Sequence, residues 1–236
     1  MTDQFLQGRI ALVTGASRGI GAATAEAMAA AGAHVVLTAR TTADLEAAED
    51  RIHAAGGTAT IAPLDLVEAD SIARLAEAVA QRWGRLDILM LNAATLGSLT
   101  PVAQIDGKEF SRVLTLNVLA AQALIAGFDP LLRKSEAGRL LAVTSSVGRT
   151  PRAYWGAYGA SKAALEALVL SYAEEVRNLS GVRVAIIDPG ATATTMRARA
   201  FPGEDPATLK PPGAVADAVV ELVRRGFETG ERVEVR

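Results

Sequence analysis

Short, continuous apolar runs alternate with longer helical patterns along the whole chain, and this alternation constrains the fold more than any other feature. The runs are rich in Val, Ile and Leu and do not alternate between polar and apolar positions. Such runs are typical of strands that are buried on both faces, as in parallel sheets covered by helices on both sides. They lie at residues 10–15, 34–39, 58 to about 65, 86–94, 138–146 and 182–190, with a short last strand expected at 231–236.

Helical patterns fill the segments between these runs, at residues 19–32, 42–57, 70–84, about 106–128, 154–178 and 213–225. The fourth is expected to stop before Pro130, since proline disrupts the helix interior. Strand–helix repetition predicts an α/β fold with a doubly wound parallel sheet, the Rossmann fold. No linker marks a second domain, so residues 1–236 are expected to form one. The polar, Pro-rich segment 191–212 is long for a loop, which predicts a lid over the substrate site.

Composition disfavours several classes of protein. The formal net charge of -2 gives no broad attraction to nucleic acid. The absence of cysteine excludes disulfides and thiolate metal sites, and no metal site is expected. The N-terminus lacks the apolar region of a signal peptide, and no apolar run approaches the roughly 20 residues that span a bilayer. We therefore expect a cytoplasmic protein that binds neither membranes nor nucleic acid.

The stretch TGASRGIG has two chemical interpretations. Gly15, Ser17 and Gly19 match G-x-S-x-G, a turn that exposes a nucleophilic serine in many hydrolases. Gly15, Gly19 and Gly21 also form a glycine-rich turn between a strand and a helix, a common phosphate cradle. The hydrolase interpretation requires a histidine late in the chain, but both histidines of this sequence precede residue 54. The dinucleotide interpretation is therefore favoured.

The end of the second strand indicates which dinucleotide binds. An acidic residue there would hold the 2′-hydroxyl of NAD, but the sequence reads Thr38-Ala39-Arg40. Arg18 lies inside the glycine loop. Two guanidinium groups suit the 2′-phosphate of NADP, because arginine binds phosphate through two parallel hydrogen bonds. These residues predict NADP(H) as the cofactor.

Tyr158 and Lys162 are four residues apart in a helical pattern, so they share one face. A tyrosine can give a proton to a carbonyl oxygen as hydride reaches the carbon, although its ordinary pKa of about 10 is too high for easy exchange at neutral pH. A nearby ammonium favours the phenolate and lowers that pKa. The alternative is a helix surface with a lysine that extends to solvent.

With these motifs the chain resembles the short-chain dehydrogenase/reductase family over nearly its whole length. The matching motifs, in order, are TGASRGIG at 14–21, Asp65-Leu66, Asn92-Ala93-Ala94, Asn117, Ser145, Tyr158-x-x-x-Lys162, and Pro189-Gly190 with Thr194.

The resemblance implies four catalytic residues. Tyr158 is similar to the general acid in reduction and the base in oxidation, and Lys162 to its electrostatic partner and a ribose ligand. Ser145 is similar to the hydroxyl that orients the substrate carbonyl, with Ser146 as the fallback. Asn117 resembles the residue that holds a water in the proton relay; the alternative is a polar residue that satisfies a helix kink.

The resemblance also implies a cofactor site. Asp65 and Leu66 would contact adenine, Asn92 would brace the fourth strand, and the segment after Pro189 would meet the nicotinamide carboxamide. With the two arginines, the expected cofactor-binding residues are Gly15, Ser17, Arg18, Gly19, Ile20, Gly21, Arg40, Asp65, Leu66, Asn92, Ala93, Tyr158, Lys162, Pro189, Gly190, Thr192 and Thr194.

These residues predict an NADP-dependent oxidoreductase that interconverts a small-molecule carbonyl and a secondary alcohol by hydride transfer. Two alternatives stay open, a non-catalytic NADP(H)-binding regulator on the same fold and another hydride chemistry such as double-bond reduction. The helices that carry Asn117 and Tyr158 are apolar over a broad arc, which favours a homodimer or homotetramer.

Overall fold

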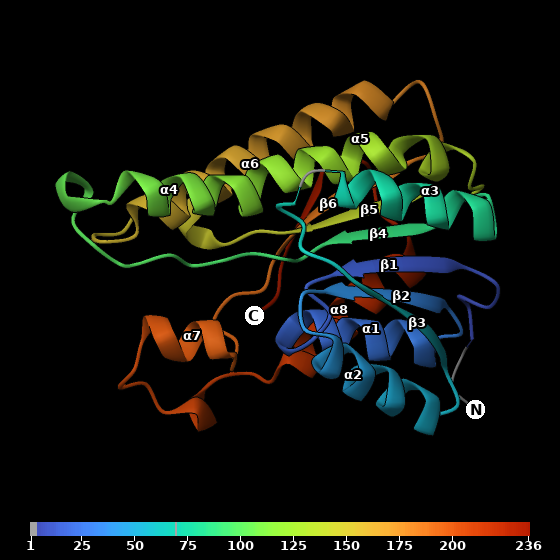
Figure 1. Cartoon of the computed structure of the whole chain (residues 1–236), viewed down its shortest axis with the longest axis horizontal. Helices are drawn as coiled ribbons and strands as arrows, with labels where there is room; N and C mark the ends of the chain where they lie inside the picture. Colours follow the sequence, from blue (N-terminus) through green and yellow to red (C-terminus); the bar gives the residue numbers. More distant parts are fainter. Residues whose placement is uncertain (1–3, 69) are drawn as a thin grey trace.

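A computed structural model describes residues 4–68 and 70–236 of the chain, so the predicted domain boundary at residue 1 lies outside the described residues. Within these residues, parallel strands form one sheet in the order β3-β2-β1-β4-β5-β6-β7 (Figure 1). The predicted doubly wound sheet is confirmed. The strands are β1 (Ile10–Thr14), β2 (His34–Ala39), β3 (Thr58–Pro63), β4 (Ile88–Leu91), β5 (Arg139–Val143), β6 (Arg183–Asp188) and β7 (Glu231–Glu234).

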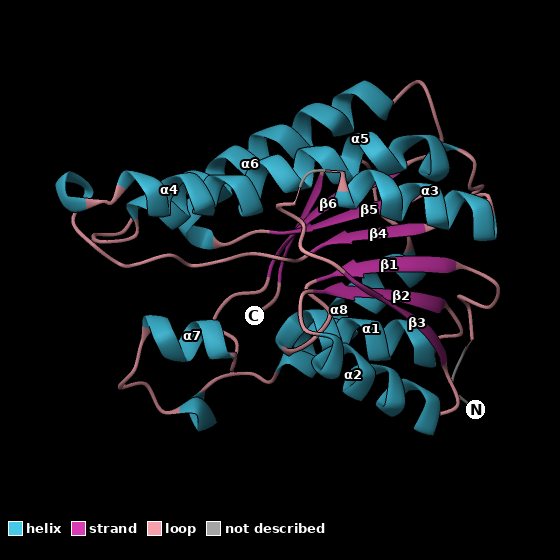
Figure 2. Cartoon of the chain, in the orientation of Figure 1, coloured by secondary structure: helices cyan, strands magenta, loops and turns pink. Residues whose placement is uncertain are grey.

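Helices cover both faces of this sheet. Figure 2 shows α1, α2 and α8 on one face and α3, α5 and α6 on the other. The helices are α1 (Gly19–Ala30), α2 (Thr42–Ala54), α3 (Ser71–Trp83), α4 (Gly107–Leu114), α5 (Ala120–Arg133), α6 (Gly156–Val176), α7 (Thr195–Ala200) and α8 (Pro212–Arg225). Short helical turns are η1 (Val102–Gln104), η2 (Thr115–Leu119), η3 (Ser146–Gly148) and η4 (Pro206–Thr208).

Alternate side chains of each central strand enter opposite cores. On β1, Leu12 packs with the α3, α5 and α6 layer, whereas Ala11 and Val13 pack with α1, α2 and α8. All three side chains are fully buried. Burial on both faces explains why the strands read as continuous apolar runs in the sequence.

The strand order reverses at β1, which pairs with β2 on one side and with β4 on the other. In open α/β sheets, ligands bind outside the carboxyl ends of the strands at such a reversal. The sequence motifs that follow β1, β2, β3, β4, β5 and β6 therefore gather at one edge of the sheet.

The helix that was expected to stop before Pro130 continues through it to Arg133, so that boundary was wrong. Proline removes one helical hydrogen bond, at a cost of about 3 kcal/mol in a helix interior. The next two residues, Leu131 and Leu132, are buried in the core. Burying two leucines stabilises by about 3–6 kcal/mol, which is enough to hold the last turn in place.

One continuous helical stretch, Gly107–Arg133, is long and apolar enough to cross a membrane by length and composition, with a mean hydropathy of 1.4. The expectation that no apolar run approaches this length was therefore wrong by this measure. Its α5 part packs against the sheet through Leu124, Phe128 and Leu132, all buried. In the structure, one face of this helix is therefore buried in the core of the protein.

The segment 191–212, expected as an irregular loop, contains the helix α7 and the turn η4. Arg197 on α7 forms a two-pronged ion pair with Glu204, with N–O distances of 2.5 and 2.6 Å. The sequence did not indicate this helix, because only six residues form it. Figure 1 shows α7 at the carboxyl-end edge of the sheet, apart from the main helical layers.

Candidate active site

The glycine loop between β1 and α1 has a backbone that other residues would not tolerate. Gly15 and Gly19 adopt left-handed φ angles of 65° and 58°. A Cβ atom on Gly21 would lie 2.3 Å from the carbonyl oxygen of Gly15. Among the described residues, no side chain caps the N-terminus of α1, so its free N–H groups and helix dipole can receive an anion. Ser17 and Ile20, both half-buried, complete a loop that fits a phosphate group.

The end of β4 holds this loop in place. Asn92 donates its side-chain amide to the carbonyl oxygens of Thr14 and Gly15, at 2.8 and 3.2 Å. The Thr14 hydroxyl accepts from the backbone N–H groups of Asn92 and Ala93, at 3.0 and 3.1 Å. A Cβ on Gly15 would approach Ala93 Cα to 3.0 Å, so the β1 and β4 ends are in close contact.

Arg18 and Arg40 are both exposed, and neither guanidinium group has a hydrogen bond or ion pair with any residue in 4–68 or 70–236. With no partner in the described part of the chain, these two guanidinium groups, one in the glycine loop and one after β2, can bind an added phosphate. Asp65 lies beyond the end of β3 and accepts the N–H of Val67 at 3.2 Å. Leu66 is buried in the core, so its side chain faces the interior.

Tyr158 and Lys162 lie on the first turns of α6. Lys162 is 2% exposed, and its Nζ donates to the carbonyl oxygen of Val143 at 2.8 Å. Nζ lies 5.7 Å from the centroid of the Tyr158 ring. Burial lowers the pKa of Lys162 to about 8, while the charge of Glu166 acts in the opposite direction.

Burial also raises the pKa of the Tyr158 hydroxyl, and the nearby Asp188 carboxylate raises it further. This direction is opposite to the one expected from the lysine charge alone. A phenol buried at 8% exposure is therefore held in its protonated form in the free protein. In that form it is a proton donor.

Two hydroxyl groups in this region have no hydrogen-bond partner among the residues that the structure describes. Within the described ranges, neither the Tyr158 hydroxyl nor the Ser145 hydroxyl makes a hydrogen bond to another residue. Ser145 is half-buried and immediately precedes η3, whereas its neighbour Ser146 is exposed. Both unpartnered hydroxyls are thus able to bind an added oxygen atom.

The turn η3 packs directly on α6, which brings the end of β5 to the start of that helix. A Cβ on Gly148 would lie 3.1 Å from the backbone nitrogen of Ala163 and the carbonyl carbon of Lys162. A Cβ on Gly159 would lie 3.0 Å from the carbonyl oxygen of Val147. These two glycines permit the close approach.

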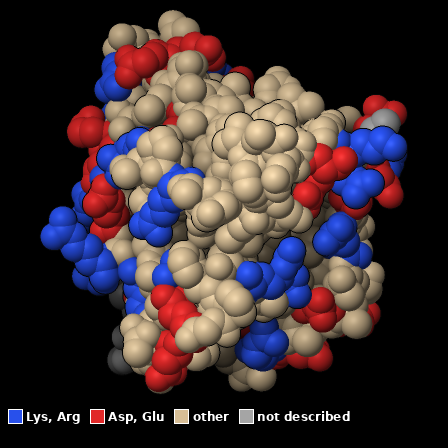
Figure 3. Space-filling view, turned by 90° about the vertical axis from the view of Figure 1, so that its left-hand side faces the viewer, with Lys and Arg blue, Asp and Glu red and all other residues tan. Residues whose placement is uncertain are grey.

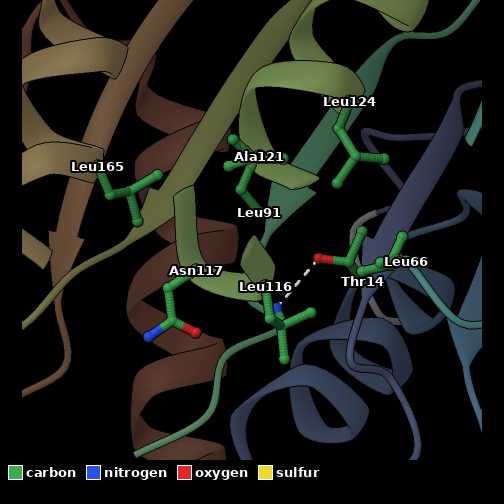
Figure 4. Close-up of a pocket in the computed structure, with 9 residues that line it drawn as sticks. Thr14, Leu66, Leu91, Leu116, Asn117, Ala121, Leu124 and Leu165 are labelled. Carbon is green, nitrogen blue, oxygen red and sulfur yellow. Dashed lines mark hydrogen bonds between the residues drawn. The ribbon is translucent and has the colours of Figure 1, made fainter. Parts of the chain in front are cut away.

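Asn117 is 1% exposed and lies in the π-helical turn η2 between α4 and α5. Its side-chain nitrogen donates to Thr95 O at 2.9 Å and Ser161 Oγ at 2.9 Å, and its side-chain oxygen accepts from Thr95 N at 2.8 Å. Both amide donors are used, so a water held by Asn117 would have to donate to its side-chain oxygen or bind its main chain. A small cavity of about 10 Å³ lies beside it. In Figure 4, Leu116 lies between Asn117 and Thr14 around this cavity.

The segment after β6 lies against the glycine loop. Gly190 has a left-handed φ of 60°, and its N–H donates to Asp188 at 3.0 Å. The Thr192 hydroxyl donates to the carbonyl oxygen of Pro189 at 3.0 Å. Thr194 caps α7, and its Cγ2 lies 3.5 Å from the Cβ position of Gly19.

Sequence reasoning predicted a lid at residues 191–212, but it missed the contact between Phe201 of this segment and Trp155. The ring of Trp155 lies 6.0 Å from that of Tyr158 and 5.6 Å from that of Phe201, measured between centroids. Glu166, which is buried and one helical turn beyond Lys162, was also missed. Its spacing of four from the lysine is a signal that could have found it. No local signal connects Phe201 to Trp155.

Known proteins resemble this chain over most of its length. The sequence model described as short chain dehydrogenase matches residues 9–205. The uncharacterized oxidoreductase YciK of Escherichia coli K12 is 40% identical, with 90% of this chain and 85% of that protein covered. A short chain dehydrogenase from Salmonella enterica serovar Typhi has a TM-score of 0.95 at 38% identity, covering 100% of this chain and 98% of that one. A metagenomic short-chain oxidoreductase in complex with NADP has a TM-score of 0.84 at 35% identity, covering 98% of each chain.

Proposed function

The chain belongs to the short-chain dehydrogenase family of oxidoreductases, and on this premise we propose that it is an NADP(H)-dependent enzyme that interconverts a carbonyl compound and a secondary alcohol. One observation carries the proposal. The hydroxyls of Ser145 and Tyr158 have no partner among the described residues, and they belong to elements in direct contact, beside the buried Lys162. A purely structural cluster would pair such hydroxyls with one another or with the backbone.

NADP(H) is supported as the cofactor by the residues at the glycine loop. The free N–H groups at the start of α1 would receive its pyrophosphate, and the guanidinium groups of Arg18 and Arg40 would bind its 2′-phosphate. The NADP complex of a 35%-identical metagenomic relative is consistent with this choice. When bound, the cofactor supplies or accepts the hydride.

The chain's own residues would handle the proton and the orientation of the substrate. Ser145 donates a hydrogen bond to the carbonyl oxygen and fixes its position. Tyr158, protonated in the free protein, gives its proton to the same oxygen as it becomes an alkoxide. The ammonium of Lys162 stabilises the phenolate that remains. In the oxidative direction the same groups work in reverse.

The surroundings of Tyr158 favour a substrate with a sizeable apolar part. Tyr158 clusters with buried Leu96 and Val147, and further apolar side chains pack on this cluster: Leu99, Trp155, Met196 and Ala200. Figure 3 shows the end of the molecule that carries α4 and α7, where a broad uncharged surface is bordered by charged side chains. Residues 191–212 would act as the lid over such a substrate.

The assembly and location of the enzyme belong to the same proposal. The helical layer at α4 and η2 has an apolar groove lined by Gly107, Phe110, Ser111, Leu114, Thr115, Val118 and Leu119. Leu119 is 60% exposed. A second copy of the chain would cover this face in a homodimer or homotetramer. With no cysteine in the sequence, a cytoplasmic location suits the protein.

The experiment that tests the proposed function follows NADPH absorbance with a panel of aldehydes and ketones. Oxidation of NADPH by the wild-type protein, and its loss in Tyr158→Phe with NADPH affinity unchanged within a few-fold, would support it. NADPH binding without oxidation across the panel would favour a non-catalytic regulator. Near-full activity of Tyr158→Phe would refute the role given to this tyrosine.

A further inference from the structure

A cluster of charged residues is centred on Glu166, one helical turn beyond Lys162 on α6. The carboxylate of Glu166 is 6% exposed and is bound by three donors. The Thr144 hydroxyl donates to Oε1 at 2.5 Å. Arg232 donates from two nitrogens, at 2.9 Å to Oε1 and 2.6 Å to Oε2. These contacts fix one carboxylate in a buried position and in a single orientation.

Each partner of Glu166 belongs to a different part of the site. Glu166 follows Lys162 by one helical turn on the same face of α6. Thr144 lies between β5 and Ser145, and Arg232 belongs to the last strand, β7. The cluster thus connects α6, which carries Tyr158, with the end of β5, which leads to Ser145, and with the last strand, β7.

Lys162 needs a compensating negative charge more than an exposed lysine would. It is almost completely buried, and its ammonium has one hydrogen-bond acceptor in the described structure, the carbonyl oxygen of Val143. A buried ammonium with so few partners tends to lose its proton. The proposed function requires the protonated form. Glu166 is the group whose charge opposes this loss.

We propose that Glu166 is a positioning residue that keeps Lys162 protonated, and that Arg232 sets the strength of this effect by holding and partly neutralising the carboxylate. The last strand thereby contributes to the electrostatics of the site without touching the substrate. The proposal rests on the proposed function for its effect on turnover, but the protonation of Lys162 can be measured independently.

Among the described residues, three other charged groups act on this cluster: Arg149 acts on Glu166, and Asp188 and Glu234 act on Arg232. Asp188 at the end of β6 acts on Tyr158. Arg149, which follows η3, acts on Glu166 and pairs with Glu234 of β7 at 2.5 Å. None of these is altered in the variants below, so their contribution is common to all the proteins compared.

The test is a pH titration of Lys162 in the full-length protein labelled with isotopic lysine, followed by NMR. The chain has only four lysines, Lys108, Lys134, Lys162 and Lys210, and a Lys162→Arg variant assigns the signal. Glu166→Gln removes the negative charge and leaves Arg232 unpaired nearby. We expect its Lys162 midpoint to lie at least about one pH unit below that of the wild type, a tenfold change in proton affinity.

The matched control is Glu174→Gln, on the same helix. Glu174 also pairs with an arginine, Arg177 at 2.6 Å, but its side chain is 68% exposed. Its loss should leave the Lys162 midpoint in place. The double variant Glu166→Gln/Arg232→Met removes both charges and should bring the midpoint back toward the wild-type value. If the cluster only held β7 against α6, the Lys162 midpoint of the double variant would not move back toward the wild-type value.

An unchanged Lys162 midpoint in folded Glu166→Gln overturns the proposal. If that variant does not fold, Arg232→Met alone decides: it removes a positive charge, so the midpoint should rise, and an unchanged or lower midpoint overturns the proposal. The pH profile of kcat/KM then checks the link to turnover. Activity should be lost on the alkaline side at a lower pH in Glu166→Gln than in the wild-type protein. A wild-type protein without turnover would refute the proposed function, while the titration would still test whether Glu166 keeps Lys162 protonated.

Discussion

Lys162 is a charged side chain in the protein interior, and its burial has a measurable consequence for stability. Its folded pKa of about 8 lies below the ordinary value of 10.5. Between these pH values the unfolded chain holds a proton that the folded protein has given up, so stability rises with pH in this window.

Compared with Lys162→Met, the wild-type protein should therefore gain stability as pH rises from about 8 to 10.5, by roughly 3 kcal/mol. Urea unfolding of both proteins at several pH values measures the difference, and the other titrating groups cancel in the comparison. A difference in unfolding free energy that stays constant with pH would contradict the lowered pKa.

The two exposed arginines at the glycine loop should decide between the two nicotinamide cofactors. Arg18→Ala/Arg40→Ala is expected to weaken NADPH binding by about 100-fold or more and to leave NADH binding nearly unchanged, since each lost charge-assisted hydrogen bond costs roughly 1.5–3 kcal/mol and at least two are lost. Calorimetric titration with both cofactors measures this. Arg74→Ala, another exposed arginine, is the control. An equal loss for both cofactors would refute the 2′-phosphate contact.

For single residues, the sequence predicts which groups could react better than it predicts what surrounds each group in the folded protein. The spacing of Tyr158 and Lys162 places them together, because helical geometry is local. The raised pKa of Tyr158 depends on burial and on Asp188, which lies on another strand. Arg232 reaches Glu166 across 66 residues of sequence, and no local pattern could indicate that contact.

Between elements, η3 packs closely on α6 at the site. Gly148→Ala would place a Cβ 3.1 Å from backbone atoms of Ala163 and Lys162, which cannot move without shifting the helix. We expect kcat/KM to fall about tenfold or more, since small misplacements of reacting groups are costly, and stability to fall by roughly 1–3 kcal/mol. NADPH binding should change little.

Gly213→Ala is the control for this change, because a Cβ there meets nothing within 4 Å. It should keep full activity and stability. If Gly148→Ala also kept wild-type kcat/KM, the tight packing of η3 on α6 would not be what positions Ser145 for the reaction.

The elements themselves show where sequence patterns succeed and fail. β2 follows the predicted residues, because its apolar run ends where the strand does. β4 is shorter than predicted, at Ile88–Leu91, because the polar Asn92 leaves the ladder to bond β1. Pro130 misled the prediction for α5, since buried leucines beyond it hold the helix. The π-turn at Asn117 depends on tertiary hydrogen bonds and has no sequence signature.

For the whole molecule, the sheet order follows from the chain of strand–helix units, which is why the fold class could be predicted. The arrangement of side chains around Tyr158 could not be predicted, because Trp155 meets Phe201 from a distant part of the chain. The apolar groove at α4 and η2 likewise becomes visible only when the helix is placed on the sheet.

That groove gives a prediction for the assembly. Leu119→Arg places a charge on a side chain that is 60% exposed at the groove, so it should dissociate the homo-oligomer and leave the fold intact. Analytical ultracentrifugation measures the mass, and far-ultraviolet circular dichroism checks the fold. The wild-type protein sedimenting as a monomer, or Leu119→Arg retaining the wild-type mass, would contradict this interface.

The central claim is that Tyr158, Ser145 and Lys162 act on a carbonyl held beside the nicotinamide. Its most direct test uses NADPH deuterated at the transferable position, incubated with a mixture of carbonyl compounds and analysed by mass spectrometry. Wild-type protein is expected to give an alcohol with one deuterium on carbon, and Tyr158→Phe to give none while still binding NADPH. An unlabelled product, or equal labelling by both proteins, would contradict the claim.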